Sequence, residues 1–328
     1  MEKSNKNIRT LYGNSFNLEN STEFEYRNKW NLNPENNIIE QFPLHLDIEI
    51  TNYCNLKCSF CASTIYNYEK KGFMKLDVFK KIIDESARKG LYALKLNWRG
   101  EPLLNNNIIE MVKYAKQSGI HDVFMNTNGY YLTEGISREL IYAGLDRIIF
   151  SFEGNTKEVY EKYRIGSNFE RVTNNIRKFC EIRNSINSKK PIIRVQTVKV
   201  PELCENETVY KEYWKDIADE ITIIDIRDEK KDFTGIYDQN WKCPYLWIRL
   251  TISFDGNVYP CCFVTKGDEN YDGSEKIGNV LSNSIESIWK SKIMNDLRDF
   301  HINGCINKID LCSKCSFRGT DITKNILL

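Results

Sequence analysis

The sequence lacks the patterns that mark several common enzyme classes. Among 328 residues there are only three histidines, with no recognisable Ser/His/Asp arrangement and no GxxxxGK[ST] phosphate-binding loop. The formal net charge is +1, so nothing points to strong attraction by nucleic acid or an anionic membrane. These absences argue against triad hydrolysis, P-loop chemistry and a nucleic-acid partner.

Long apolar runs are missing as well. The first ten residues are polar and contain no apolar signal-peptide core, and no run approaches the length of a membrane span. We therefore expect a cytoplasmic protein with no membrane partner. Eleven cysteines in such a chain favour metal or redox chemistry over disulfides, and an odd number excludes complete pairing.

Three of the cysteines form a CxxxCxxC loop at Cys54, Cys58 and Cys61. Iron–sulfur clusters are held by cysteine thiolates, usually four of them. Three thiolates could bind three irons of a cubane cluster and leave the fourth iron open to an outside ligand. The alternatives are a zinc site or a chance grouping, although zinc sites favour two close cysteines and a second pair elsewhere.

This loop resembles the signature of the radical SAM enzymes, including an aromatic residue, Phe60, just before the last cysteine. In that family S-adenosylmethionine chelates the open iron. Its reductive cleavage releases a 5′-deoxyadenosyl radical, which takes a hydrogen atom from the substrate. The resemblance implies S-adenosylmethionine and a 4Fe-4S cluster as cofactors, and a reducing partner such as flavodoxin or ferredoxin.

Downstream of residue 43, segments with strand and helix patterns alternate. Leu46, Ile48 and Ile50 alternate along a strand that runs into the cysteine loop. Further strands are expected at 92–98, 121–126, 146–152, 192–198 and 220–226, separated by helices near 76–87, 107–118, 133–143, 168–184 and 206–218.

Such alternation predicts an α/β fold with a parallel sheet and right-handed crossovers. Six units are too few for an eight-stranded barrel, and periodicity alone would also fit a doubly wound sheet. The family resemblance favours a partial (β/α)6 TIM-like barrel.

Unusual polar motifs follow four successive strands. They are the cysteine loop, Trp98–Pro102, Asn126–Gly129 and Ser151–Gly154. Ligands of parallel α/β folds bind at the carboxyl ends of strands, so we expect these motifs to form one rim. Glu153, Arg227, Lys199 and Trp98 are candidates to face the enclosed cavity.

The resemblance assigns several rim residues to S-adenosylmethionine. Gly100-Glu101-Pro102 is similar to the family's GGEP element near the methionine amino group, with Arg99 replacing the first glycine. A plain strand-ending turn is the alternative. Asn126, Thr127 and Asn128 match the ribose-contacting strand end, although Asn-Gly is also an ordinary turn signal.

A second set of expected cofactor contacts lies further along the chain. Ser151 and Arg164 resemble the pair that maturases of the family use on the ribose and on the methionine carboxylate. Gln196 and Val198 could touch the adenosine. The alternatives are a solvated charge at a helix start for Arg164 and ordinary strand positions for Gln196 and Val198.

The region after residue 240 contains a second group of cysteines. Asp255-Gly256 between two strand-like runs predicts a hairpin that brings Cys243 and Cys261 together. A helix is expected near 284–300, followed by a CxxC at Cys312 and Cys315. Four thiolates from a hairpin and a CxxC turn can close a metal site.

This region resembles the SPASM domain in its shortened "twitch" form, which implies one auxiliary 4Fe-4S cluster on Cys243, Cys261, Cys312 and Cys315. A zinc ribbon with the same ligands is the alternative. Two further thiols, Cys262 and Cys305, could replace a ligand, donate hydrogen to a substrate radical, or be buried small hydrophobes. Cys180 and Cys204 have no assigned role. We expect an N-terminal extension at 1–42, a barrel at 43–235 and an auxiliary domain at 236–328.

A fully ligated second cluster has no open iron and could accept an electron from a substrate radical. This favours oxidation of a carbohydrate-like or other small alcohol. The sequence is similar to the twitch-containing dehydrogenase of the butirosin pathway and to members from polysaccharide and antibiotic pathways. A peptide maturase or epimerase is the alternative. A non-enzymatic metal-binding or electron-carrying protein would explain the cysteines but not the rim motifs.

Overall fold

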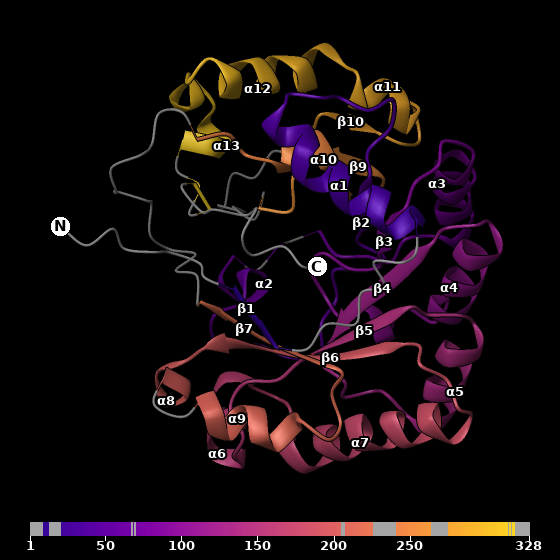
Figure 1. Ribbon diagram of the computed structural model, residues 1–328, viewed down its shortest axis with the longest axis vertical. Coiled ribbons are helices and arrows are strands. Elements are labelled where there is room, and N and C mark those ends of the chain that lie inside the picture. Colours follow the sequence, from indigo (N-terminus) through magenta and orange to yellow (C-terminus); the bar gives the residue numbers. More distant parts are fainter. Residues whose placement is uncertain are drawn as a thin grey trace.

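The computed structural model describes residues 9–12, 21–66, 68, 70–204, 207–225, 241–263, 275–313, 315 and 317–318. These residues form one ten-stranded sheet with the order β1-β7-β6-β5-β4-β3-β2-β8-β9-β10 (Figure 1). The strands are β1 Arg9–Tyr12, β2 His45–Ile48, β3 Ala93–Lys95, β4 Asp122–Thr127, β5 Arg147–Ser151, β6 Ile192–Lys199, β7 Glu220–Asp225, β8 Arg249–Ile252, β9 Asn257–Tyr259 and β10 Gly278–Asn279.

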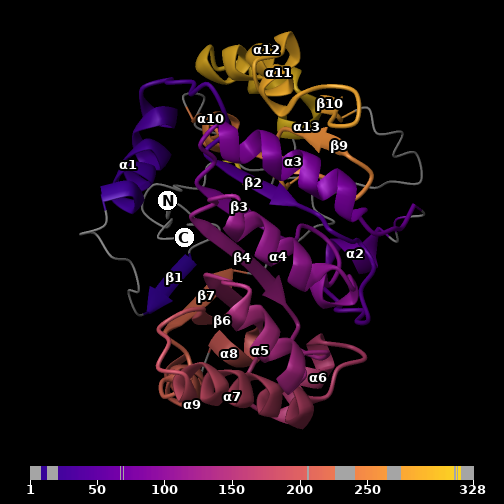
Figure 2. The same ribbon diagram turned by 90° about the vertical axis from the view of Figure 1, so that its right-hand side faces the viewer.

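Helices connect most of these strands and cover the sheet. Figure 2 shows α3, α4, α5 and α7 along one face of it. No described helix is long and apolar enough to cross a membrane. The helices are α1 Ser21–Glu35, α2 Ala62–Ile65, α3 Leu76–Arg88, α4 Ile108–Gln117, α5 Glu134–Tyr142, α6 Lys157–Tyr163, α7 Phe169–Ser185, α8 Pro201–Cys204, α9 Glu207–Trp214, α10 Tyr245–Ile248, α11 Ile285–Trp289, α12 Lys292–Ile302 and α13 Asp310–Ser313.

The six strands β2 to β7 pair in sequence order, and every one of these pairings is parallel. A parallel pair needs a crossover between its strands, and helices supply it here. The predicted α/β fold with a partial six-unit barrel is confirmed. The sequence missed α6, the short helix after β5.

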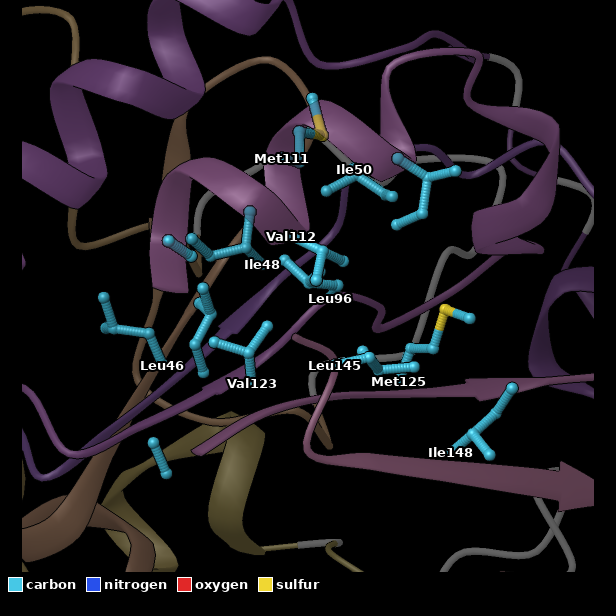
Figure 3. Packing of buried hydrophobic residues seen from close by; sticks show 14 of the residues in the cluster. Leu46, Ile48, Ile50, Leu96, Met111, Val112, Val123, Met125, Leu145 and Ile148 are labelled. Carbon is cyan, nitrogen blue, oxygen red and sulfur yellow. The ribbon is translucent and has the colours of Figure 1, made fainter. Parts of the chain in front are cut away.

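The helix-facing side of the sheet is apolar. Leu46 and Ile48 of β2 pack with Met111 and Val112 of α4, and all four side chains are fully buried (Figure 3). Burying one such side chain stabilises the fold by about 1.5–3 kcal/mol. The alternation predicted for β2 therefore holds this strand, and the cysteine loop that follows it, against the helical layer.

The opposite face of the same strands is polar. His45, Asp47 and Glu49 alternate with the apolar residues and are at most 1 % exposed. Arg249 of β8 donates to Asp47 at 2.7 Å and lies 3.0 Å from His45 Nε2. Closed barrels usually fill their interior with bulky apolar layers. Here paired charges occupy the amino end of the interior instead.

The C-terminal region joins the same sheet. Strand β8 pairs in parallel with β2, and the predicted hairpin is confirmed because β8 and β9 are antiparallel. The prediction of a single helix near 284–300 is wrong. The segment forms two helices, α11 and α12, because Ser291 caps the second by accepting the backbone N–H of Met294 at 3.3 Å.

The described part of the N-terminal extension packs on the rest of the chain. Strand β1 pairs antiparallel with β7, and α1 buries Tyr26 and Trp30 beside α10. Figure 1 shows α11 and α12 at the β2 side of the sheet and α6, α7 and α9 at the other end. The expected boundary near residue 235 lies outside the described residues, so the domain limits stay predictions.

Candidate radical SAM site and auxiliary cluster site

The cysteine loop leaves the carboxyl end of β2 and ends at α2. Cys54 is exposed, Cys58 is buried and Cys61 is half-buried, and none of them forms a disulfide. The loop closes on itself where Cys61 N–H donates to Cys58 O at 3.1 Å. Three free thiols at graded depth on one loop fit a cluster that is covered on one side and open on the other.

The end of β3 supports this loop through its backbone. Gly100 has a φ of +73°, and a Cβ at this position would lie 2.4 Å from Thr51 O and 2.8 Å from Tyr53 O. The next residue, Glu101, donates its N–H to Tyr53 O at 2.8 Å. Only glycine allows this approach at this φ. Gly100 therefore positions the cysteine loop directly.

The carboxylate of Glu101 ties the ends of β3 and β4 together. It accepts hydrogen bonds from Leu103 N at 3.1 Å, Thr127 Oγ1 at 2.6 Å and Asn128 N at 2.8 Å. Burial raises the pKa of Glu101, and these hydrogen bonds oppose the rise. A carboxylate has about four acceptor positions, so one remains for the predicted contact with a methionine amino group.

Two asparagines of the β4 end also face the loop region. Asn128 Nδ2 donates to Asn55 Oδ1 at 2.9 Å, which links β4 to the cysteine loop. The backbone N–H of Asn126 donates to Asn97 Oδ1 at 2.8 Å. Asn126 Oδ1 is buried and has no hydrogen-bond partner among the described residues. This free acceptor leaves Asn126 available to a ligand.

Arg164 is not the solvated charge at a helix start that was one interpretation. It is the C-cap residue of α6 and pairs through two guanidinium nitrogens with Glu153. Its Nη1 lies 3.6 Å from Cys58 Sγ, and its guanidinium carbon is 5.5 Å from the Phe60 ring. Burial raises the pKa of Cys58, and Arg164 opposes the rise.

The same helix end fixes the loop backbone, since Lys57 N–H donates to Ile165 O at 2.9 Å. Because Glu153 already occupies the Arg164 fork, the contact of Arg164 with a methionine carboxylate stays a prediction.

Two predicted residues and one that was not predicted form a row across neighbouring strands. Ser151 of β5 is in register with Gln196 of β6, which is in register with Thr222 of β7. Ser151, Gln196 and Val198 are half-buried. Thr222 is buried, and its Oγ1 has no partner in the described part of the chain. The sequence analysis missed Thr222, which the two-residue alternation of β7 would have placed on the polar face.

Arg99, which replaces the first glycine of the family's GGEP element, forms a buried ion pair. It donates to both carboxylate oxygens of Glu49, at 2.6 and 3.0 Å, and lies 4.0 Å from the centre of the Trp98 ring. Trp98 Nε1 donates to Cys262 O at 2.8 Å. These contacts connect the rim to the C-terminal cysteines. Of the other cavity candidates, Lys199 pairs with Glu207 at 2.7 Å, and Arg227 lies outside the described residues.

The second cysteine group surrounds one cavity. The four predicted ligands, Cys243, Cys261, Cys312 and Cys315, all line it. Burial raises the pKa values of Cys243, Cys261 and Cys312, and the neighbouring thiols raise them further. Bound iron would lower these pKa values again, because it stabilises the thiolates. The remaining lining residues are Trp241, Leu246, Pro260, Phe263, Leu297, His301, Leu311 and Phe317.

Four thiols are also the donor set of a structural zinc ribbon, which was the alternative from the sequence. The donor set of four thiols is the usual one for a 4Fe-4S cluster.

The remaining cysteines divide by position. Cys262 is half-buried and follows the cavity residue Cys261. Cys305 is half-buried outside the cavity lining, with its thiol 3.6 Å from Asn303 O. Cys180 lies in α7 and Cys204 ends α8.

His301 of α12 is a cavity residue that the sequence analysis missed. Its Nδ1 accepts the backbone N–H of Cys243 at 3.2 Å. Burial and the charge of Arg318 lower the pKa of His301 to about 4. The imidazole is therefore neutral near pH 7. No local spacing signal could have linked it to Cys243, which is 58 positions away.

Two family models match the two cysteine regions separately. The Radical SAM superfamily model matches residues 48–190, and the SPASM model, an iron-sulfur cluster-binding domain, matches residues 243–316. A probable GTP 3′,8-cyclase of Methanococcus maripaludis is 36 % identical over 135 residues. That match covers 41 % of this chain and 45 % of the relative, so the chain spans less than half the length of this relative.

Solved structures share the fold over most of the chain. BtrN in complex with AdoMet and 2-DOIA superposes with a TM-score of 0.59 at 17 % identity, covering 84 % of this chain and 94 % of BtrN. Native anSMEcpe with bound AdoMet and the Cp18Cys peptide superposes with a TM-score of 0.58 at 14 % identity, covering 84 % and 88 %. With both cysteine regions matched, the chain carries a radical SAM domain and a C-terminal SPASM domain, which imply S-adenosylmethionine and two iron–sulfur clusters as its cofactors.

Proposed function

We propose that this radical SAM enzyme oxidises an alcohol of a small, carbohydrate-like molecule and uses the auxiliary cluster as electron acceptor. The observation that carries the proposal is the apolar cavity with four cysteines. Four thiolates saturate a cubane cluster, which leaves no iron for substrate binding. Electron acceptance is a function that such a cluster can still perform.

The proposed reaction balances without an additional oxidant. The bound cofactors supply a 5′-deoxyadenosyl radical that takes one hydrogen atom from the alcohol carbon, after which the substrate releases one proton to solvent and one electron to the auxiliary cluster and becomes a carbonyl. A flavodoxin or ferredoxin is proposed to supply the electron that starts each turnover and to take back the electron of the reduced auxiliary cluster.

The polar face of the sheet supports a hydroxylated substrate. Asn126 Oδ1 and Thr222 Oγ1 are buried without partners among the described residues, and Gln196 is half-buried beside Thr222. Leaving a buried polar atom unpaired costs about 1–3 kcal/mol, so these atoms favour a ligand that hydrogen-bonds to them. Alcohol groups both donate and accept, which suits this mixed set.

The contacts between the two regions support electron transfer from one to the other. Trp98 reaches Cys262 O, next to Cys261, while Gly100 contacts the backbone of the cysteine loop. Only one residue, Arg99, thus lies between the residue that contacts the auxiliary site and the residue that contacts the cysteine loop. The small-molecule complex of BtrN shares this fold, but at 17 % identity the likeness extends only to the fold.

The test is an anaerobic reaction of the reconstituted enzyme with S-adenosylmethionine, a reductant and a panel of aminocyclitols and sugars. We expect a product two hydrogens lighter than its substrate and one S-adenosylmethionine cleaved per product. With deuterium at the alcohol carbon, the label should appear in 5′-deoxyadenosine. A product of unchanged mass that carries solvent deuterium at carbon would contradict oxidation.

A second candidate is epimerisation of a peptide, which Cys262 favours. Its half-buried thiol lies beside the auxiliary site, and its carbonyl is held by Trp98. The thiol would give a hydrogen atom to the substrate radical and would then need one electron and one proton from the external reductant. In that case Cys262→Ala would abolish solvent deuterium incorporation while 5′-deoxyadenosine formation continued. The peptide complex of anSMEcpe has the same fold.

A further inference from the structure

His301 borders the auxiliary site without being one of its four predicted ligands. It lies in α12, is 1 % exposed and lines the same cavity as Cys243, Cys261, Cys312 and Cys315. Histidine at a metal site usually acts through both ring nitrogens, one of which orients the ring. The two nitrogens of His301 are therefore considered separately.

The first nitrogen defines the tautomer. Nδ1 lies 3.2 Å from the backbone nitrogen of Cys243 and accepts its N–H. An accepting Nδ1 carries no proton, so the proton of the neutral ring is on Nε2. The same hydrogen bond fixes the orientation of the ring relative to one of the predicted cluster ligands.

The second nitrogen has no hydrogen-bond partner in the part of the chain that the structure describes. Nε2 of His301 is buried and makes no hydrogen bond within the described chain. Burying an N–H without an acceptor is unfavourable, because the group loses its hydrogen bond to water. Trp241 lies with its ring centre 6.2 Å from the imidazole, and the other non-cysteine side chains of the cavity are apolar. The acceptors that this cavity would offer are the sulfur atoms of the cluster and its thiolates.

We propose that His301 donates its Nε2–H to a sulfur of the auxiliary cluster and thereby raises the reduction potential of that cluster. Hydrogen bonds to sulfur stabilise the added negative charge of the reduced state, and they are one of the main determinants of cluster potential. A higher potential makes the cluster a better acceptor of the substrate electron. This benefit rests on the proposed function, whereas the hydrogen bond itself does not.

The test compares two substitutions that separate the two ring nitrogens. His301→Asn keeps an acceptor near the Nδ1 position for Cys243 but has no group at the Nε2 position. His301→Gln can place an amide N–H near the Nε2 position. Both are made in the variant with Cys54, Cys58 and Cys61 changed to Ala, so that only the auxiliary cluster remains, and the potential is measured by titration followed by EPR.

We expect the potential to fall in His301→Asn by an amount equal to at least a tenfold change in the reduction equilibrium, which is about 59 mV for one electron. His301→Gln should recover most of that shift. An unchanged or higher potential in His301→Asn would overturn the proposal. A merely structural role would change the iron content or the thermal stability without a systematic shift of the potential.

A second measurement does not require the His301 variants to take up the auxiliary cluster. Pulsed EPR of the reduced auxiliary cluster, in protein labelled with ¹⁵N-histidine and unchanged at His301, should detect weak coupling to one histidine nitrogen. The absence of coupling, or the strong coupling of a direct ligand, contradicts the proposal. If the parent variant binds zinc in place of iron, the proposed electron acceptor fails as well. If it binds iron and only the His301 results are negative, the proposed function stands.

Discussion

The two cysteine regions of this protein are built in opposite ways. The loop with Cys54, Cys58 and Cys61 lies among polar strand ends. It accepts hydrogen bonds from Glu101 and Asn128 and donates one to the backbone that follows α6. The C-terminal cysteines line an apolar cavity in which Tyr245, Phe263 and Phe317 stack on one another. One region is polar, and the other is apolar with one buried and three half-buried cysteines.

The difference fits the exchange that we propose for each cluster. A cluster that receives S-adenosylmethionine needs an open iron and polar groups for the amino, carboxylate and ribose groups of its ligand. A cluster that receives only electrons needs no access to solvent, and its potential is set by burial and by hydrogen bonds to sulfur. Polar surroundings therefore accompany ligand exchange, and apolar surroundings accompany electron exchange.

The sharpest way to break this comparison is to remove one thiol from each region. Cys58→Ala should abolish S-adenosylmethionine cleavage. Cys261→Ala should retain cleavage but lose the oxidised product, because the substrate radical has no acceptor. Each should lose about four irons per chain, the content of one 4Fe-4S cluster. Iron content is measured by a colorimetric assay on the anaerobically prepared proteins. The amounts of 5′-deoxyadenosine and of oxidised product are measured by chromatography.

The matched control is Cys180→Ala, which removes a buried thiol in α7 outside both regions. We expect it to keep the iron content and both products of the parent. A Cys261→Ala protein that still forms oxidised product in the normal ratio to 5′-deoxyadenosine would show that the auxiliary cluster is not the acceptor.

A smaller effect is expected from the glycine that holds the open loop. Gly100→Ala should lower the free energy of unfolding by about 3 kcal/mol or more, since it adds a steric clash to the cost of a left-handed φ. The clash is with Thr51 O, 2.4 Å from the added Cβ. Urea unfolding measures the loss of stability, and a binding assay measures the effect on S-adenosylmethionine affinity.

Gly119→Ala is the matched control for Gly100→Ala. Gly119 also has a positive φ, +94°, but a Cβ there would meet nothing within 4 Å. It should cost only about 1–2 kcal/mol and leave cofactor binding unchanged. Equal effects of the two substitutions would mean that the close approach of Gly100 to the cysteine loop contributes nothing.

The smallest effect concerns the buried charges at the amino end of β2 and β8, where Arg249 lies between His45 and the ring of Tyr245. Burial and Arg249 lower the pKa of His45 to about 4, against about 6.5 for an unfolded histidine. Between these values the unfolded chain binds the extra proton, so stability falls as pH falls below about 6.5. From pH 7 to pH 5.5 this group should cost about 1 kcal/mol.

Anaerobic urea unfolding at the two pH values measures this loss. His45→Asn should reduce the pH dependence by about that amount, whereas His121→Asn, which changes an exposed histidine, should not. A pH dependence that is the same in all three proteins would contradict the prediction. Unchanged iron content in these variants would separate general stability from the properties of the two clusters.

Local patterns in the sequence predicted much of this architecture. Two-residue and helical periodicity placed the six parallel strands, and Asp255-Gly256 placed the β8–β9 hairpin. These patterns are readable because alternation and turn chemistry act between residues that are near one another in the chain. The break before α12 also has a local signal, the capping residue Ser291. The apolar residues continue with helical spacing on both sides of it, and they led to the prediction of a single helix.

Spacing along the chain also predicted where the candidate site residues lie in the fold. Both cysteine groups and the motifs after β3, β4 and β5 could be located from the sequence, because ligand sites of parallel sheets collect at strand ends. What the sequence could not supply was the partner of each side chain. Arg164 was assigned to an external carboxylate or to solvent, and it pairs with Glu153.

The sequence by itself determined the family, the two cysteine groups and the order of strands and helices, because each depends on spacing along the chain. Tertiary structure alone decided that β8 joins the barrel sheet, that Glu49 receives Arg99, that Thr222 faces Gln196 and that His301 meets Cys243. These contacts join residues 26 to 204 positions apart, and only packing of the whole sheet brings them together.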